Sequence, residues 1–432
     1  MNVKRLLSCI AMFTVFNAQA QLTLPPQVVA PITPIIDKLP KDLSDIRQGL
    51  RDNVVQQQQQ LSKVGQRLTK PLFAIPETVA IKAAGGKHIL REVITPEGDI
   101  AVEREWVLLG RQQDIHALSH PDITVVDARF LPSLSQWVFT VKVSAALDEV
   151  SRIRDTLPPS LSAQIARNHV YLSQSGAIHG DPISATPPIR QCEIPTRVGM
   201  IDTQIYTEHA VFQHIQLQQQ SFLEEGTPIS NIHGTAVAGL LAEEMHAGSQ
   251  LYNAGVFYQR NSVSQGATLF ALINGLEYLA ALQVDTINMS LAGPHNPVLE
   301  SVLKTIDKQG IQVVSAAGNE GPAAPPAYPA AYASTVAVTA VDKANAIYRW
   351  ANQGDYIDFS ALGVSVKTAH PQEEAYRETG TSMAAPRVTA RYACALRSSK
   401  DRARAMTQLI EMAVDVGEIG RDMVYGYGII QK

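Results

Sequence analysis

The sequence has no long hydrophobic run after its first twenty residues, so no later segment predicts a transmembrane helix. Neither sign of charge dominates: the formal net charge is -4, which gives no reason to expect nucleic acid or an anionic membrane as a partner. Charged residues make up 18% of the 432 residues and hydrophobic residues 45%, which is typical of a folded soluble protein. A chain of this length has room for two or three domains, one of them with a large core.

Motifs for nucleotide binding and metal catalysis are also absent. Neither G-x-G-x-x-G nor G-x-x-x-x-G-K follows the strand predicted at 197–201, which excludes a nucleotide-binding α/β domain. No H-E-x-x-H occurs, and His209 and His214 are five residues apart, so they do not share one face of a helix. We therefore expect no metal site in the chemistry and no required cofactor.

Residues 1–20 have the three parts of a secretory signal. The basic, apolar and small-residue parts are Lys4-Arg5, 6–16 and Ala18-Gln19-Ala20. The apolar part is too short for a membrane anchor, and Cys9 lies inside it, too early for lipid attachment. We expect a secreted protein, periplasmic or extracellular.

Cysteine is scarce, and removal of this signal leaves two, Cys192 and Cys394. In an oxidising compartment an even pair favours a disulfide. The alternative is two buried free thiols, because the sequence does not supply the Cα separation that a bridge needs.

Four regions follow the signal. Residues 21–100 are rich in Pro and Gln, and their apolar residues recur at helical spacing, which predicts one long amphipathic helix that packs on a partner or acts as a spacer. Residues 101–174 combine strand and helix patterns, 175–195 have the Gly and Pro content of a linker, and 196–432 alternate strand and helix signals. The apolar positions of the predicted helix are Leu43, Ile46, Leu50, Val54, Leu61, Val64 and Leu68.

Residues 101–174 predict a small α+β unit. The order is strand, short helix, strand, strand, amphipathic helix, strand, at 102–109, 112–118, 123–130, 137–143, 147–157 and 169–172. This βαββαβ order is the split ferredoxin-like arrangement. A unit of this size folds alone, or nearly so.

Residues 196–432 predict an α/β domain. Strands are expected at 197–201, 251–257, 284–289, 311–315 and 335–341, and helices at 235–244, 268–282, 297–309 and 382–396. The strands are mostly apolar without alternation, as when both faces of a sheet are covered. The alternation of strands and helices predicts a mostly parallel sheet with helices on both faces. In such sheets the reactive groups gather beyond the carboxyl ends of the strands.

Four polar residues fall at such positions. Asp202 and Asn319 follow predicted strands, and His233 and Ser382 lie at predicted helix starts. A serine hydroxyl is a poor nucleophile unless a base removes its proton, and an imidazole oriented by a carboxylate is such a base. The α/β-hydrolase order is excluded because His370 is the last histidine and none follows Ser382. A chymotrypsin-like order would need β-barrels, which the helix-rich pattern contradicts.

Residues 196–432 resemble the subtilisin-like serine peptidases, the subtilases. Five blocks stand in the family's order, at 198–203, 233–239, 288–293, 317–321 and 380–386. The order Asp202, His233, Ser382 is also that of subtilisin. The resemblance implies a monomeric serine endopeptidase that hydrolyses polypeptides through an acyl-enzyme intermediate.

The resemblance implies a role for each matched residue. Ser382 attacks the carbonyl, His233 moves the proton, and Asp202 orients the imidazole. The amide of Asn319 and the backbone N–H of Ser382 face the oxyanion. One segment pairs with the substrate backbone as an added strand, which favours extended polypeptide with broad side-chain tolerance. This segment consists of Ser290, Leu291, Ala292 and Gly293.

Two positions depart from the family pattern. Ala236 stands where a second histidine is common, and Thr203-Gln204 replaces Ser/Thr-Gly after the aspartate. Because Ala236 does not replace a triad member, we expect activity to survive. Subtilases often bind structural calcium, but no Asp-rich loop allows such a site to be placed in this sequence.

Subtilases are commonly made with a ferredoxin-like pro-domain that assists folding and blocks the site, and residues 101–174 resemble one. We therefore expect a precursor that is inhibited by its own pro-domain and cleaves itself between Ser173 and Thr196. The alternative for residues 101–174 is a permanent regulatory domain. The alternative for the whole chain is a catalytically silent binding protein on a subtilase scaffold, against which the intact Asp-His-Ser set and Asn319 argue.

Overall fold

The computed structural model describes residues 78–83, 85–173, 176–177, 192–261, 264–372 and 376–431. The chain divides into two units, Met1–Pro76 and Glu77–Lys432. The predicted signal at 1–20 and the predicted amphipathic helix therefore lie outside the described residues. Within the described ranges, no helix has the length and apolar character needed to span a membrane.

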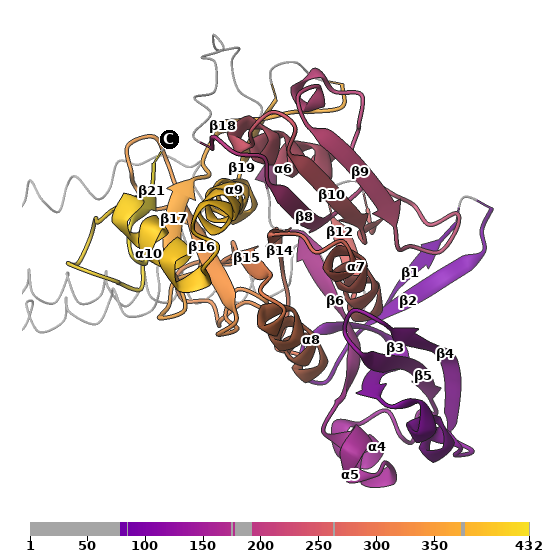
Figure 1. Ribbon diagram of the computed structural model, residues 1–432. Coiled ribbons are helices and arrows are strands. Elements are labelled where there is room, and N and C mark those ends of the chain that lie inside the picture. Colours follow the sequence, from indigo (N-terminus) through magenta and orange to yellow (C-terminus); the bar gives the residue numbers. More distant parts are fainter. Residues whose placement is uncertain are drawn as a thin grey trace, which may run out of the picture. The chain divides into compact units, whose positions relative to one another are not determined.

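Among the described residues the second unit has two nine-stranded sheets, and the mostly parallel one, which we call the parallel sheet, lies in the C-terminal half of the chain (Figure 1). Its strand order is β20-β21-β17-β16-β15-β13-β8-β10-β9, and all neighbours are parallel except β20 and β21. The strands are β8 Arg197–Asp202, β9 Gln216–Ser221, β10 Gln250–Gly255, β13 Thr286–Met289, β15 Gln312–Ala316, β16 Thr335–Val341, β17 Phe359–Leu362, β20 Ala413–Val414 and β21 Ile429–Ile430. This is the mostly parallel α/β sheet that the sequence predicts.

Helices cover both faces of this sheet, because the side chains that the strands direct to each face are apolar. In β8, Val198 and Met200 pack with α6 and α9, whereas Ile201 packs on the opposite side with α7 and α8. Each such fully buried aliphatic side chain contributes about 1.5–3 kcal/mol. The helices are α6 Ile232–Glu244, α7 Leu269–Ala281, α8 Pro297–Lys308, α9 Thr381–Ser399 and α10 Arg402–Met412, the last packed beside α9.

The second nine-stranded sheet, in which every strand pair is antiparallel, contains the predicted βαββαβ order. We call it the antiparallel sheet. Its elements are β3 Ile100–Gly110, η3 Gln112–Leu118, β4 Ile123–Leu131, β5 Gln136–Val143, α4 Val150–Thr156, α5 Pro159–Ser162 and β6 Ile165–Ser173. The strands lie in the order β4-β5-β3-β6, with every neighbouring pair antiparallel. The predicted helix at 147–157 is shorter and is followed by α5 after Pro158, because proline disfavours a helical conformation in the residue before it. The predicted strand at 169–172 is longer than expected.

A hairpin lies within residues 21–100, the segment predicted as Pro- and Gln-rich. Its strands, β1 Thr78–Lys82 and β2 His88–Ile94, pair with each other and extend the antiparallel sheet beside β3. The hairpin is mostly exposed, and its buried residues include Ile81 and Glu92. Glu92 is buried because Arg260 and Tyr258, far along the chain, bind its carboxylate. The sequence around Glu92 does not predict these two partners.

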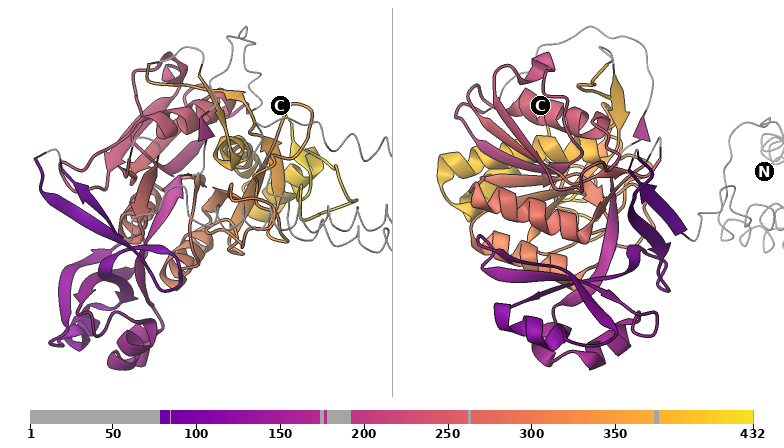
Figure 2. Two further views of the ribbon diagram at one scale, coloured as in Figure 1. Left: turned by 180° about the vertical axis from the view of Figure 1, so that it is seen from behind. Right: turned by 90° about the vertical axis from the view of Figure 1, so that its right-hand side faces the viewer.

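The antiparallel sheet continues into the C-terminal half. The end of β6 pairs with β12 Gln265–Thr268 on one side and with β14 Leu291–Ala292 on the other, and β12 pairs with β11 Tyr258–Gln259. A further small sheet joins β18 Val366–Lys367, β19 Arg377–Thr379 and β7 Gly176–Ala177. Figure 2 shows the antiparallel sheet lying along the α7 and α8 side of the parallel sheet. Residues 176–177, predicted as linker, are thus paired as a strand.

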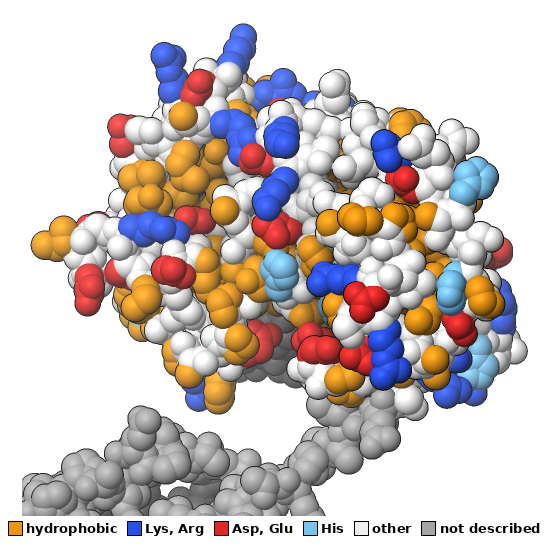
Figure 3. All heavy atoms as spheres, turned by 90° about the horizontal axis from the view of Figure 1, so that it is seen from below, with side chains coloured by type: hydrophobic (Ala, Val, Ile, Leu, Met, Phe, Trp, Pro, Cys, Tyr) orange, Lys and Arg blue, Asp and Glu red, His pale blue; other side chains and the backbone are white. Residues whose placement is uncertain are grey.

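The surface carries both signs of charge. Figure 3 shows basic and acidic side chains interspersed over the face drawn, with no broad area of one sign. Apolar side chains are also exposed near the C-terminal elements, where Ile419 and Met423 are fully and largely exposed. Mixed charge of this kind is the usual surface of a soluble domain.

Candidate active site

The predicted carboxylate and imidazole meet. Asp202 is the last residue of β8 and His233 the second of α6, so one strand end and one helix start bring them together. Nδ1 of His233 lies 2.6 Å from Oδ1 of Asp202, and the same oxygen accepts the backbone N–H of Thr203 at 2.7 Å. Both side chains are buried, which protects the pair from water. An acceptor at Nδ1 places the proton of the neutral ring there and leaves Nε2 as the basic nitrogen.

The surroundings of His233 favour its charged form. Burial by itself lowers the pKa of this imidazole, but the charge of Asp202 and its hydrogen bond raise it, and the charge of Glu378 adds to the same effect. The net result is a His233 pKa above its ordinary value. An imidazolium formed during proton transfer is therefore stabilised in place.

Ser382 is the second residue of α9 and is fully buried. Its hydroxyl donates to the carbonyl oxygen of Ser290 at 3.3 Å, while Nε2 of His233 has no hydrogen-bond partner among the described residues. The structure thus forms the Asp202–His233 pair and leaves the Ser382–His233 hydrogen bond unmade. Proton transfer requires the hydroxyl to exchange the Ser290 carbonyl for Nε2, as catalytic hydrogen bonds often tighten only with substrate bound.

The backbone of Ser382 is held by its own helix sequence. Pro386 has no N–H, so the carbonyl of Ser382 lacks its usual partner four residues on. The Ser290 hydroxyl supplies a donor instead, at 3.1 Å, and itself accepts from Nδ2 of Asn288 at 3.0 Å. The N–H of a second helical residue has no acceptor within the helix. The N–H of Ser382 is therefore suited to bind an external oxygen.

Asn319 follows β15 and is oriented by the same helix start. Its Oδ1 accepts both the backbone N–H of Thr381 at 3.0 Å and the Thr381 hydroxyl at 3.1 Å. These two bonds turn the Nδ2 donor end away from Thr381. Gly318 before it has φ 111°, and a Cβ there would come within 2.6 Å of the Asn352 and Glu320 side chains. Glycine is needed for this turn.

The predicted substrate-pairing segment carries a strand. Within Ser290, Leu291, Ala292 and Gly293, the strand β14 pairs antiparallel with the end of β6, with Leu291 opposite Ser173 and Ala292 opposite Leu172. On its other side, the same end of β6 pairs with β12, with Gly266 opposite Leu172. The end of β6 is therefore inserted between two strands of the C-terminal half.

A deep contact anchors this inserted strand. Tyr171 is fully buried, and its hydroxyl donates to the carbonyl of Pro294 at 3.2 Å. A Cβ at Gly293 would lie 2.4 Å from the Tyr171 ring, so only glycine leaves room for it. The strands β12 and β19 were not predicted, and the last residue of β12 was assigned to a helix, because both strands are too short to carry a periodic signal.

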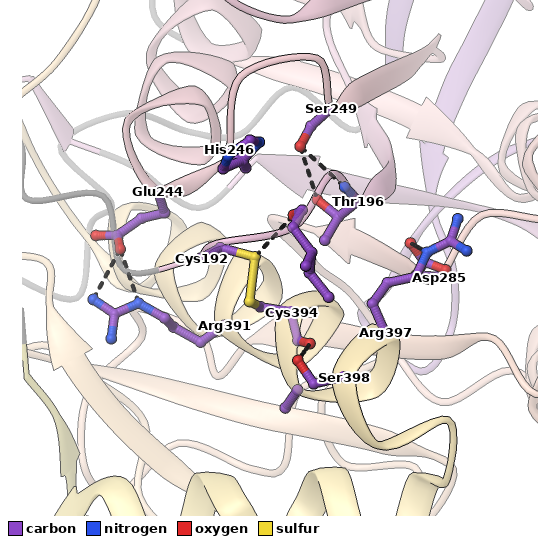
Figure 4. The surroundings of a disulfide bond; sticks show 12 residues. Cys192, Thr196, Glu244, His246, Ser249, Asp285, Arg391, Cys394, Arg397 and Ser398 are labelled. Atoms are coloured by element: carbon purple, nitrogen blue, oxygen red, sulfur yellow. Dashed lines mark hydrogen bonds and ion pairs between the residues drawn. A yellow bond between two sulfur atoms is a disulfide. The ribbon is translucent and has the colours of Figure 1, made fainter.

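The two cysteines form a disulfide in the structure, with a Cα–Cα distance of 5.7 Å (Figure 4). Cys192 precedes β8, and Cys394 lies on α9, the helix that begins beside Ser382. The ion pairs Glu244–Arg391 and Asp285–Arg397 lie on either side of the bridge in Figure 4. The bridge therefore ties the segment before the Asp202 strand to the helix of Ser382.

His209 and His214, which the sequence does not place on one helix face, each contact the backbone. Nδ1 of His209 accepts the N–H of Val211 at 3.2 Å, and Nε2 of His214 lies 2.9 Å from the carbonyl of Ala242. No group of three or more His, Cys, Asp or Glu side chains in the described ranges is arranged to hold a metal ion.

Residues 193–428 match the Subtilase family, and the chain belongs to it. It is 34% identical over 215 residues to the Minor extracellular protease Epr of Bacillus subtilis (strain 168), covering 46% of this chain and 32% of that protein. It is 35% identical over 211 residues to the Subtilisin of Bacillus pumilus, covering 46% of this chain and 74% of that protein. Among solved structures, one described as "Crystal Structure of a Lanthipeptide Protease" aligns with a TM-score of 0.47 and 20% identity, over 54% of this chain and 84% of that one. The chain spans between 32% and 66% of the length of the first three curated relatives that it matches.

Proposed function

We propose that this chain is the precursor of a secreted serine endopeptidase that cleaves extended polypeptides. The observation that carries the proposal is the insertion of the β6 end between β12 and β14, beside Ser382. A substrate strand bound in the same way would pair its backbone with both flanking strands. Recognition of main chain rather than side chains suits unfolded or extended polypeptide.

The proposed mechanism follows from the geometry. The Ser382 hydroxyl attacks the substrate carbonyl as Nε2 of His233 takes its proton, and Asp202 stabilises the imidazolium. The developing oxyanion accepts hydrogen bonds from the Asn319 amide and the N–H of Ser382. His233 then gives the proton to the leaving amine as the C–N bond breaks. Water hydrolyses the resulting acyl-enzyme through the same imidazole.

Residues 101–174 act, in this proposal, as a ferredoxin-like pro-domain. The strand order β4-β5-β3-β6 supports this identification. The domain is fixed to α7, where Glu277 accepts the backbone N–H groups of Ser133 at 2.8 Å and Leu134 at 3.1 Å. With β6 in the cleft, no other polypeptide can occupy the same strand position. The pro-domain would therefore inhibit the enzyme until it leaves.

The registers of two ladders select one bond for self-cleavage. In the β6–β14 ladder, Ser173 lies opposite Leu291, so a substrate strand in this register would place its next residue opposite Ser290. In the β7–β19 ladder, Gly176 lies opposite Thr379, and a substrate strand in that register would place the residue two positions earlier opposite Thr381. The carbonyl of Ser290 accepts the Ser382 hydroxyl, and Thr381 precedes Ser382 in the chain. We therefore propose cleavage between Gln174 and Ser175, within the interval that the sequence predicts.

The test is the fate of the purified precursor. The unaltered chain should yield a mature fragment that begins at Ser175, identified by N-terminal sequencing and intact mass, while Ser382→Ala should remain uncut. Ser398→Ala, an exposed serine on the same helix, is the matched control and should be processed normally. If Ser382→Ala is cut at the same bond at the same rate, the cleavage comes from another protease and self-processing is wrong.

A catalytically silent scaffold is the second candidate. The observation in its favour is the Ser382 hydroxyl, which is bonded to the Ser290 carbonyl and not to His233. A fluorophosphonate probe distinguishes the two, because it reacts only with an activated serine. Labelling of the processed chain at Ser382, lost in His233→Ala, supports the peptidase; absence of labelling supports the scaffold.

A further inference from the structure

A buried carboxylate lies on the strand that leads into the nucleophile helix. Glu378 is the middle residue of β19, and Ser382 follows it closely in the sequence. Its side chain is only 3% exposed. Its charge is close enough to contribute to the raised pKa of His233. Glu378 thus acts electrostatically on His233, although the mechanism proposed for the triad does not use it.

One oxygen of this carboxylate is unsatisfied. Oε1 accepts the hydroxyl of Tyr376, whereas Oε2 is buried without a hydrogen-bond partner among the described residues. No ion pair to Glu378 is formed within the described ranges, and the neighbouring Arg377 is directed to the carbonyl of Ser365. A buried carboxylate oxygen without a donor costs free energy. A hydrogen-bond donor from a bound substrate would therefore stabilise Oε2 of Glu378.

The position of Glu378 on β19 determines which side chains of a bound substrate can donate a hydrogen bond to it. β19 pairs with β7, residues 176–177, which lie beyond the proposed Gln174–Ser175 bond. A substrate bound in this register places the third residue after the scissile bond directly opposite Glu378. The first residue after the bond is two positions away on the strand and shares the same face. Directly opposite and diagonal side chains on one face are both within reach when they are long.

Building on the proposed peptidase function, we propose that Glu378 is a specificity-determining residue that favours Lys or Arg at the first or third position after the scissile bond. A lysine ammonium or arginine guanidinium at either position can donate to the free Oε2. Charge-assisted hydrogen bonds to carboxylates are stronger than neutral ones. An acidic side chain at the same positions would meet an unneutralised carboxylate. The second position after the bond faces the other side of the strand and is not selected.

The test uses quenched fluorescent peptides that share all residues before the scissile bond. After the bond they carry alanine throughout, or a single lysine or glutamate at the first, second or third position. In the processed enzyme, lysine at the first or third position should raise kcat/KM about tenfold over alanine, which corresponds to about 1.4 kcal/mol. Glutamate there should lower it, and either residue at the second position should have little effect.

Variants separate this role from general damage. Glu378→Gln keeps the shape and the Tyr376 contact, so the ratio of kcat/KM for the lysine peptides to that for the alanine peptide should fall to about one, whatever happens to cleavage of the alanine peptide itself. Glu411→Gln removes an exposed carboxylate of α10 and should keep that preference. If the unaltered enzyme cleaves the alanine peptide but shows equal kcat/KM for lysine and glutamate at the first and third positions, the assignment of Glu378 is wrong and the peptidase proposal stands. Failure to cleave any peptide would overturn the peptidase proposal, and this inference with it.

Discussion

Removal of the Cys192–Cys394 bridge should destabilise the folded chain strongly. The bridge joins residues with a sequence separation of 202. In the chain-entropy treatment, a closed loop of this size contributes about 5 kcal/mol by restricting the unfolded state. In a domain of this size, each 1 kcal/mol lowers Tm by about 2–4 °C. The expected loss is therefore about 10–20 °C, an upper estimate because residual structure in the unfolded chain reduces the effect.

The assay is thermal unfolding followed by circular dichroism, in a Ser382→Ala background that prevents self-digestion. The parent is compared with a variant that carries both Cys192→Ser and Cys394→Ser, each with and without a thiol reductant. Reduction should lower the Tm of the parent, whereas the double variant should have the low Tm already and not respond. Ser398→Ala, which lies on the same helix beside the bridge, is the control and should retain the parental Tm.

Two sets of results would contradict the reasoning, both measured on protein that lacks residues 1–20 and therefore Cys9. If the double variant melts at the parental Tm, and the unfolded, unreduced parent titrates with two free thiols, the two cysteines are not bridged. If the parent has no free thiol but the Tm is unchanged, the bridge exists and the loop argument fails.

Three further predictions concern the oxyanion donor, the base and the attachment of the N-terminal hairpin. Asn319→Ala should lower kcat by about 10²–10³ with a smaller change in KM, a range carried over from the removal of such a donor in a subtilisin. Because His233 must be neutral to accept a proton and its pKa is raised above 6.5, the acid limb of the kcat/KM profile should lie above pH 6.5. Glu378→Gln should move that limb to lower pH, whereas Glu411→Gln should leave it in place. Glu92→Ala leaves Arg260 without its buried carboxylate and should weaken retention of the cleaved pro-segment by about 3–5 kcal/mol, measured as faster dissociation. Lys87→Ala, which breaks an exposed ion pair with Glu224, should change that rate little.

The local sequence was a good guide to the elements that carry the candidate site. The apolar run before Asp202 and the apolar positions after His233 predict the end of β8 and the start of α6, because propensity and periodicity act over a few residues. The same reasoning places Ser382 at the start of α9 and Asn319 after β15. The helix at 402–412 was missed although Asp401 caps it through the N–H of Arg404, a signal that was available.

The hairpin β1–β2 and the burial of Glu378 were beyond such reasoning. From the sequence, Glu92 and Glu378 are both expected at the surface. In the structure Glu92 is buried beside Arg260, and Glu378 is buried on the strand that pairs with β7. Gly293 reads as a turn residue, but its role is to admit the ring of Tyr171. Each of these contacts joins positions that are distant in the chain.

Short-range patterns and chain order were sufficient to predict the class of fold, the family blocks and the candidate reactive side chains. Only packing between distant segments shows that the end of β6 lies between β12 and β14, that Cys192 is bonded to Cys394, and that Arg260 binds Glu92. Strand register and burial depend on packing between segments separated by a hundred residues or more, and no local pattern encodes a distance across that separation.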